Sequence, residues 1–161
     1  MYKFYVVKYS HMFKKIIFTF IILTFASITV FANNTMIPHD KKNQYRIEIQ
    51  NRINYLTPIT IKNINEIETE IKNEKNQHIK NMLISDGINS ELLKFYIELL
   101  EITNKYTNTP IIIPPTDWYK EIKNVIDPYL KDNHICTIKI NYLLIYAKYK
   151  QSQIKNTVTT N

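Results

Sequence analysis

The chain has 161 residues, of which 45% are hydrophobic, and its formal net charge is +7 at pH 7. It contains one glycine and one cysteine, which excludes glycine-rich phosphate loops, the nucleophile elbow and an internal disulfide. Arg46 and Arg52 are its only arginines, so few guanidinium groups are available to bind phosphates or bases through bidentate hydrogen bonds.

The first 32 residues have the three parts of a secretory signal peptide. The basic stretch Met12–Lys15 precedes an apolar run from Ile16 to Phe31, and Val30-Phe31-Ala32 resembles a signal-peptidase cleavage site. We therefore predict cleavage between Ala32 and Asn33. A retained membrane anchor is the alternative, but the uncharged run of about 16 residues is shorter than the roughly 20 that a full span needs. Residues 1–11 add nothing to this signal, and Met12 is an alternative start.

Cleavage would leave an exported domain, periplasmic or secreted, of about 130 residues, which is a normal size for one domain. It would remove four lysines and no acidic residue, which lowers the net charge from +7 to +3. This mild excess does not argue for nucleic acid as a partner. Tight hairpin turns need glycine, so a single glycine favours helices over many short strands.

After a flexible leader over residues 33–43, the pattern from Gln44 to Leu56 fits either a helix or a strand. Thr57-Pro58 is expected to interrupt the chain. Asn63 and Glu66 then resemble a capping box, which predicts that a second helix starts there and runs to about Ile84. This helix is expected to break near Asn76 and to close at a turn over Ser85–Gly87. Its predicted apolar stripe consists of Ile64, Ile67, Ile71, His78 and Met82.

The clearest predicted helix runs from Ser90 to about Tyr106. Its charged residues recur at steps of three and four within an arc of about 80°. They are Glu91, Lys94, Glu98, Glu101 and Lys105. Apolar side chains cover most of the remaining surface, so this helix is expected to pack on several sides, as the central element of the domain.

An extended apolar connector is predicted over Thr109–Pro115, because proline constrains itself and the residue before it. We interpret it as a lid over the bundle, with a recognition loop as the alternative. Thr116 is expected to cap the next helix, and Asp117 to lie in its first turn. Its predicted inner face is Trp118, Ile122, Val125, Ile126 and Tyr129, and Asp127-Pro128 is expected to end or kink it.

The last long segment runs from Asn133 to about Gln153. A polar stripe at helical spacing favours a helix, and alternation over Ile138–Leu144 is the argument for a strand. The polar stripe is Thr137, Asn141, Lys148, Gln151 and Lys155, and the apolar one is Ile135, Ile138, Tyr142, Ile145 and Tyr149. We interpret the tyrosines and lysines of Tyr142–Lys150 as core aromatics with solvated lysines, with a stacking surface as the alternative. The domain is thus expected to span 44–155, with a frayed tail over 156–161.

Two residue pairs could carry chemistry. Glu74 and His78 are four apart and would face each other on one helix, either as a general base with its orienting carboxylate or as two metal ligands. His134 and Cys136 could form a soft metal pair on a strand, but on a helix they point apart. Neither pair has further ligands nearby, so we interpret both as structural, and Cys136 as a buried thiol.

The sequence therefore predicts a mainly α fold, a bundle of four or five helices, with an α+β fold as second choice. No catalytic residue, metal site or cofactor is predicted. The favoured function is a non-enzymatic binding or interaction module with an envelope or secreted protein as partner, no nucleic acid, and no stable membrane insertion after cleavage. The alternative is a small envelope hydrolase that acts on cell-wall polymers through paired carboxylates.

Overall fold

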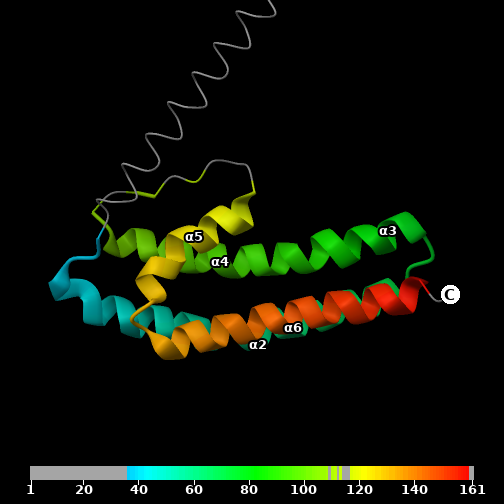
Figure 1. Cartoon of the computed structure of the whole chain (residues 1–161), viewed down its shortest axis with the longest axis horizontal. Coiled ribbons are helices and arrows are strands. Elements are labelled where there is room, and N and C mark those ends of the chain that lie inside the picture. Colours follow the sequence, from blue (N-terminus) through cyan, green and yellow to red (C-terminus); the bar gives the residue numbers. More distant parts are fainter. Residues whose placement is uncertain (1–35, 109, 112, 114–116, 160–161) are drawn as a thin grey trace, which may run out of the picture. The chain divides into compact units, whose positions relative to one another are not determined.

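The computed structural model describes residues 36–108, 110, 111, 113 and 117–159, and there the protein is mainly helical (Figure 1). The elements are a 3₁₀ turn η1 (His39–Lys41), α2 (Lys42–Asn73), α3 (Gln77–Met82), a π-helical turn η2 (Leu83–Gly87), α4 (Ile88–Tyr106), α5 (Trp118–Leu130) and α6 (His134–Thr159). The described residues contain no strand, so the predicted helical bundle is confirmed. The α+β alternative, with strands near Tyr45–Ile49 and Ile138–Leu144, is wrong.

The chain divides into two units, residues 1–36 and 37–161, and every described helix belongs to the second. The predicted cleavage between Ala32 and Asn33 and the predicted cap at Thr116 lie outside the described residues. Within the predicted leader, His39–Lys41 already forms a 3₁₀ turn and α2 begins at Lys42. The described helical structure thus begins within the segment predicted as a leader.

Helix α2 continues through Pro58 as one helix of 32 residues, so the predicted interruption at Thr57-Pro58 is wrong. Its buried residues recur along one face over the whole length: Tyr45, Ile49, Ile53, Thr60, Ile64 and Ile71. Packing of this face outweighs the one helical hydrogen bond that proline removes.

The predicted capping box is also wrong, because Asn63 lies inside α2 and its Nδ2 donates to Glu91 Oε2 at 2.7 Å.

The predicted break near Asn76 is confirmed. Helix α2 ends at Asn73, and the Asn76 side chain caps α3 by accepting hydrogen bonds from the backbone N–H groups of His78 and Ile79.

The predicted turn at Ser85–Gly87 is wrong, because these residues belong to η2, which leads directly into α4. Gly87 has a helical φ of −62°, so no left-handed glycine ends a helix here. His78 and Met82 are exposed, so their assignment to the predicted apolar stripe is wrong.

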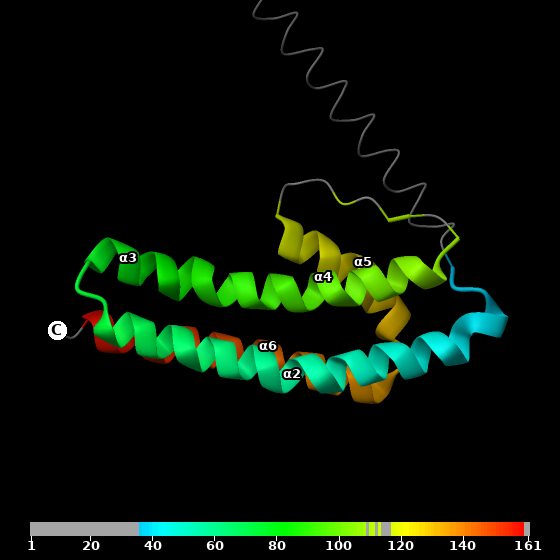
Figure 2. The same cartoon turned by 180° about the vertical axis from the view of Figure 1, so that it is seen from behind.

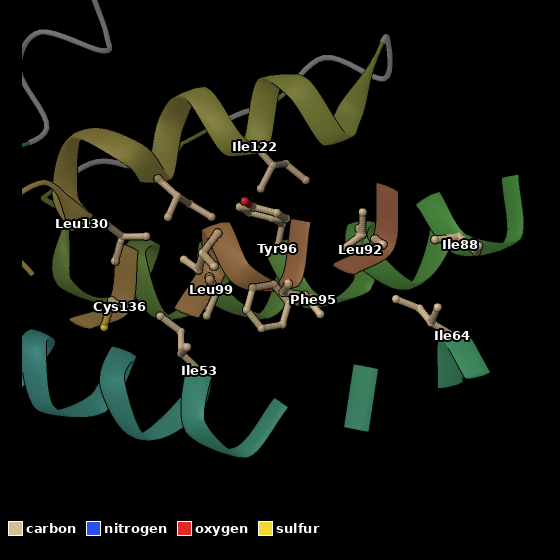
Figure 3. Close-up of a cluster of buried hydrophobic side chains, with 14 of the residues drawn as sticks. Ile53, Ile64, Ile88, Leu92, Phe95, Tyr96, Leu99, Ile122, Leu130 and Cys136 are labelled. Carbon is tan, nitrogen blue, oxygen red and sulfur yellow. The ribbon is translucent and has the colours of Figure 1, made fainter. Parts of the chain in front are cut away.

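Helix α4 packs against both α2 and α5, and α2 packs in turn against α6 (Figures 1 and 2). Its buried side chains include Leu92, Phe95, Tyr96 and Leu99, which meet Ile53 of α2 and Ile122 of α5 in one cluster (Figure 3). The prediction that this segment packs on several sides is therefore confirmed. It begins at Ile88, two residues before the predicted start, and ends at Tyr106 as predicted.

The connector and α5 agree with the sequence in part. Ile113 is non-helical, as predicted, and packs partly buried against the core, which is what a lid requires. Asp117 precedes α5 in the left-handed region, with φ 48° and ψ 48°, and its side chain makes no cap bond. Trp118 is 42% exposed and does not belong to the inner face. That face is Ile122, Ile126 and Leu130, and α5 continues two residues past Pro128.

Candidate functional site

The outward side of α6 carries large apolar side chains that none of the described helices covers. Ile135 is 61% exposed, Ile138 57%, Tyr142 56%, Ile145 68% and Tyr149 57%. We call these five residues the α6 face. The sequence predicts them as the apolar stripe of a helix, with the tyrosines in the core. The helix is confirmed, but the core assignment of Tyr142 and Tyr149 is wrong. The buried residues of α6 are instead Cys136, Ile140, Leu143, Ala147 and Ile154.

Two apolar stripes on one helix explain this error. Both follow steps of three and four residues, so periodicity alone does not distinguish the stripe that packs from the one that faces outward. At 100° per residue, the α6 face spans an arc of about 80°, centred about 150° around the helix from the buried stripe. The helix also extends to Thr159, beyond the predicted end near Gln153, and 160–161 lie outside the described residues.

One flank of the α6 face is bonded to α2. Tyr146 Oη donates to Asn65 Oδ1 at 2.6 Å, and Lys139 Nζ donates to Asn54 Oδ1. The ring of Tyr142 stacks on that of Tyr146, with centroids 6.4 Å apart and an interplanar angle of 28°. Ile47, 63% exposed, is seven residues from Asn54 on α2 and therefore lies on nearly the same side of it. One flank of the apolar surface is thus fixed in place by α2.

The charge of α6 has one sign. The helix carries Lys139, Lys148, Lys150 and Lys155 and no acidic residue. Lys150 pairs with Glu68 of α2, with Nζ and Oε2 2.6 Å apart. Lys139 and Lys148 lie beside the α6 face, one on each flank, as helical geometry places them. The α6 face is therefore apolar and bordered by cationic groups.

A polar groove of about 420 Å³ lies between α2 and α4. Its lining residues are Glu48, Asn51, Arg52, Tyr55, Glu98, Glu101 and Ile102. The charged stripe of α4 forms one wall, and its residues pair with α2. Arg52 bonds Glu98, and Lys105 Nζ lies 2.8 Å from Glu48 Oε2.

Glu48 is held as an anion in this groove. Tyr106 Oη donates to Glu48 Oε2 at 2.6 Å, beside the bond from Lys105. These two hydrogen bonds, from Lys105 first and then Tyr106, lower the pKa of Glu48. A general acid needs a carboxyl group whose pKa is raised instead. The groove thus gathers three glutamates, yet the environment of Glu48 opposes proton donation.

The two pairs singled out from the sequence do not form sites. Glu74 and His78 lie on opposite sides of the break between α2 and α3, so they do not face each other on one helix; Glu74 Oε1 instead accepts the backbone N–H of Asn76. His134 is exposed and Cys136 is buried, which confirms that they point apart. The described residues include no group of three or more His, Cys, Asp or Glu side chains placed to hold a metal ion.

Cys136 is a buried free thiol, as predicted. Its Sγ lies 3.0 Å from Gln50 Oε1 of α2 and donates to it. Burial raises the pKa of this thiol to about 11, so it stays protonated at neutral pH. A protonated, buried thiol is a poor nucleophile and a poor metal ligand.

Known proteins give no further guide to this surface. No protein-family model, no curated protein and no solved structure matches the chain. The fold defines its class, a small mainly helical bundle, and the candidate site rests on its own geometry. Across the described part of the chain, no helix combines the length and the apolarity needed to cross a membrane.

Proposed function

We propose that this protein is exported and acts as a non-enzymatic binding module, with the α6 face as its binding surface. The observation that carries the proposal is the exposure of five large apolar side chains in one continuous stripe. Together they present roughly 600 Å² of surface, at the upper end of what monomeric proteins expose in a single patch. Single exposed apolar residues are ordinary, but a stripe of this size is typical of an interaction site.

Export is supported by the sequence of the first 32 residues. The order of basic stretch, apolar run and Val30-Phe31-Ala32 is typical of a cleaved secretory signal. The mature chain is expected to begin at Asn33 and to act in the periplasm or outside the cell. Retention by an uncleaved signal is the alternative location, and it leaves the proposed binding surface unchanged.

The hydrolase alternative has one supporting observation, which is that Glu48, Glu98 and Glu101 line the same groove. Cleavage of a sugar polymer needs one protonated carboxylic acid opposite an ionised carboxylate. Hydrogen bonds from Lys105 and Tyr106 lower the pKa of Glu48, and Arg52 neutralises Glu98. Both pairings are typical of ion pairs that hold two helices together, here α2 and α4, and not of a catalytic carboxyl pair. The binding module is therefore the better-supported proposal.

Photo-crosslinking in the producing cell tests the proposal. A photoreactive benzoyl-phenylalanine in place of Ile145 is expected to give a discrete adduct with an envelope or secreted protein, in which this chain begins at Asn33. The same group in place of Tyr55, which is similarly exposed but lines the α2–α4 groove, serves as the control and is expected to give none. No adduct from position 145 would contradict the proposal. Cell-wall digestion by the wild-type protein, lost in Glu101→Gln, would establish the hydrolase instead.

A further inference from the structure

The spacing of the α6 face indicates the shape of what covers it. Its five residues follow steps of three, four, three and four, which is the a and d pattern of two heptads. A strict a/d stripe is narrower than the apolar side of an ordinary amphipathic helix and is typical of a seam between two helices. The next seam positions are Ser152 and Asn156, so the apolar part ends at Tyr149 after about 21 Å.

The flanking positions indicate the charge of the partner. Residues next to an a/d seam pair with oppositely charged residues of the facing helix. Here these positions hold Lys139 on one flank and Lys148 on the other, and α6 has no acidic residue. A second copy of α6 would bring further lysines and no carboxylate to this seam, so the charges are complementary to an acidic partner and not to a second copy.

The surface is also preorganised for such a partner. The buried stripe of α6 packs against α2, and Tyr146 and Lys139 are bonded to Asn65 and Asn54. The helix is therefore formed and its flank is fixed before anything binds. Binding to a formed helix avoids the entropy cost of ordering it.

We infer that the α6 face binds an amphipathic helix of another protein, with apolar residues at heptad spacing and acidic residues beside them. This inference rests on the proposed function and adds the chemistry of the partner. The apolar residues of the partner pack between the isoleucines and tyrosines of the seam. Its carboxylates lie beside Lys139 and Lys148, which sets both orientation and selectivity.

Two synthetic peptides of four heptads test the inference against the purified exported protein. Both carry leucine at a and d, one has glutamate at every e and g position, and the other has lysine there. We expect the glutamate peptide to bind at least about tenfold more tightly than the lysine peptide in low salt, and its affinity to fall as salt is added. Titration of fluorescently labelled peptide measures both.

Three variants locate the binding. Ile145→Asp is expected to weaken binding of the glutamate peptide at least about tenfold, because it places a carboxylate in the apolar seam. Tyr55→Asp is the matched control, since Tyr55 is 60% exposed but lines the α2–α4 groove instead of the seam, and it is expected to leave binding unchanged. Lys148→Glu is expected to reduce the preference for the glutamate peptide. All three positions are exposed, and circular dichroism verifies that each variant keeps its helices.

Several results would overturn the inference. Equal binding of both peptides would show that acidic residues are not preferred. Binding of neither would show that no such helix is recognised here. A wild-type dimer that Ile145→Asp dissociates would assign the seam to a second copy. Binding to phosphatidylglycerol vesicles without peptide binding would assign it to a membrane. If the adduct at position 145 forms while the peptides fail, the binding module stands and only the inferred partner is wrong; if both fail, the proposed function is wrong as well.

Discussion

Tyr96 combines a favourable ring with an unfavourable hydroxyl group. Its side chain is completely buried in α4, and the ring lies edge-on to Phe95 and Tyr119 at centroid distances of 5.6 and 5.5 Å. The hydroxyl is directed towards Ile122 of α5 (Figure 3) and has no hydrogen-bond partner among the described residues. Burial, then the neighbouring Tyr119 and Asp127, raise the pKa of Tyr96. The group is therefore neutral and carries its desolvation cost without a compensating bond.

Tyr96→Phe is accordingly expected to raise the free energy of unfolding by about 1 kcal/mol, since it removes the unsatisfied hydroxyl and keeps the ring. Urea denaturation measures the change. Tyr45→Phe is the matched control: Tyr45 is equally buried, but its hydroxyl lies 3.3 Å from Thr103 Oγ1, so the same substitution is expected to give no gain. A loss of stability in Tyr96→Phe would show that the hydroxyl is satisfied.

At the scale of the element, Pro58 stands in the middle of α2 on the exposed side. It has no N–H to donate to the carbonyl of Asn54, and its ring crowds that carbonyl. Pro58→Ala is expected to stabilise the protein by about 1–3 kcal/mol, less than the full proline penalty because proline also restricts the unfolded chain. Urea denaturation of Asn51→Ala, another exposed position of α2, serves as the control and is expected to change little. No gain in Pro58→Ala would mean that the bundle needs the local bend.

The helices could be predicted from the sequence more reliably than the faces they bury. The single glycine and the helical spacing indicate the fold class, and Asn76 and Tyr106 mark real boundaries. The passage of α2 through Pro58 could not be predicted, because it depends on packing against other helices. The candidate site was missed for the same reason: the residues of the α6 face were identified, but their exposure depends on which stripe meets α2. Their strict heptad spacing was the available signal.

At the scale of the whole molecule, carboxylates join α2 to its two neighbours. Glu68 of α2 meets Lys150 of α6, and Glu91 of α4 meets Asn63 of α2. Hydrogen bonds from Lys150 and Lys72 lower the pKa of Glu68. Burial alone would raise the pKa of Glu91, but hydrogen bonds from Lys94 and Asn63 lower it overall. These contacts depend on ionised carboxylates and so on pH.

A lowered pKa in the folded state means that the folded protein releases the proton more readily than the unfolded chain. The resulting stability is present above the unfolded pKa of glutamate, near 4.5, and is lost as the pH falls through the folded value. We therefore expect the free energy of unfolding to fall below about pH 4.5. Glu68→Gln is expected to reduce the difference in stability between pH 7 and pH 3, measured by urea denaturation. Glu66→Gln, which is 63% exposed at its side chain, is the control, and an equal effect from both would contradict the assignment.

The two stripes of α6 have a consequence for how the bundle reaches a single structure. Polarity alone would allow this helix two rotational settings about its own axis, about 150° apart. The stripe that faces inward includes Cys136 and Ala147, whose side chains are small, beside Ile140, Leu143 and Ile154. The other stripe carries Tyr142 and Tyr149, whose side chains are larger than any in the buried stripe. We therefore expect side-chain volume, rather than hydrophobicity, to select the native setting of the last helix and to leave its bulkier side turned outward.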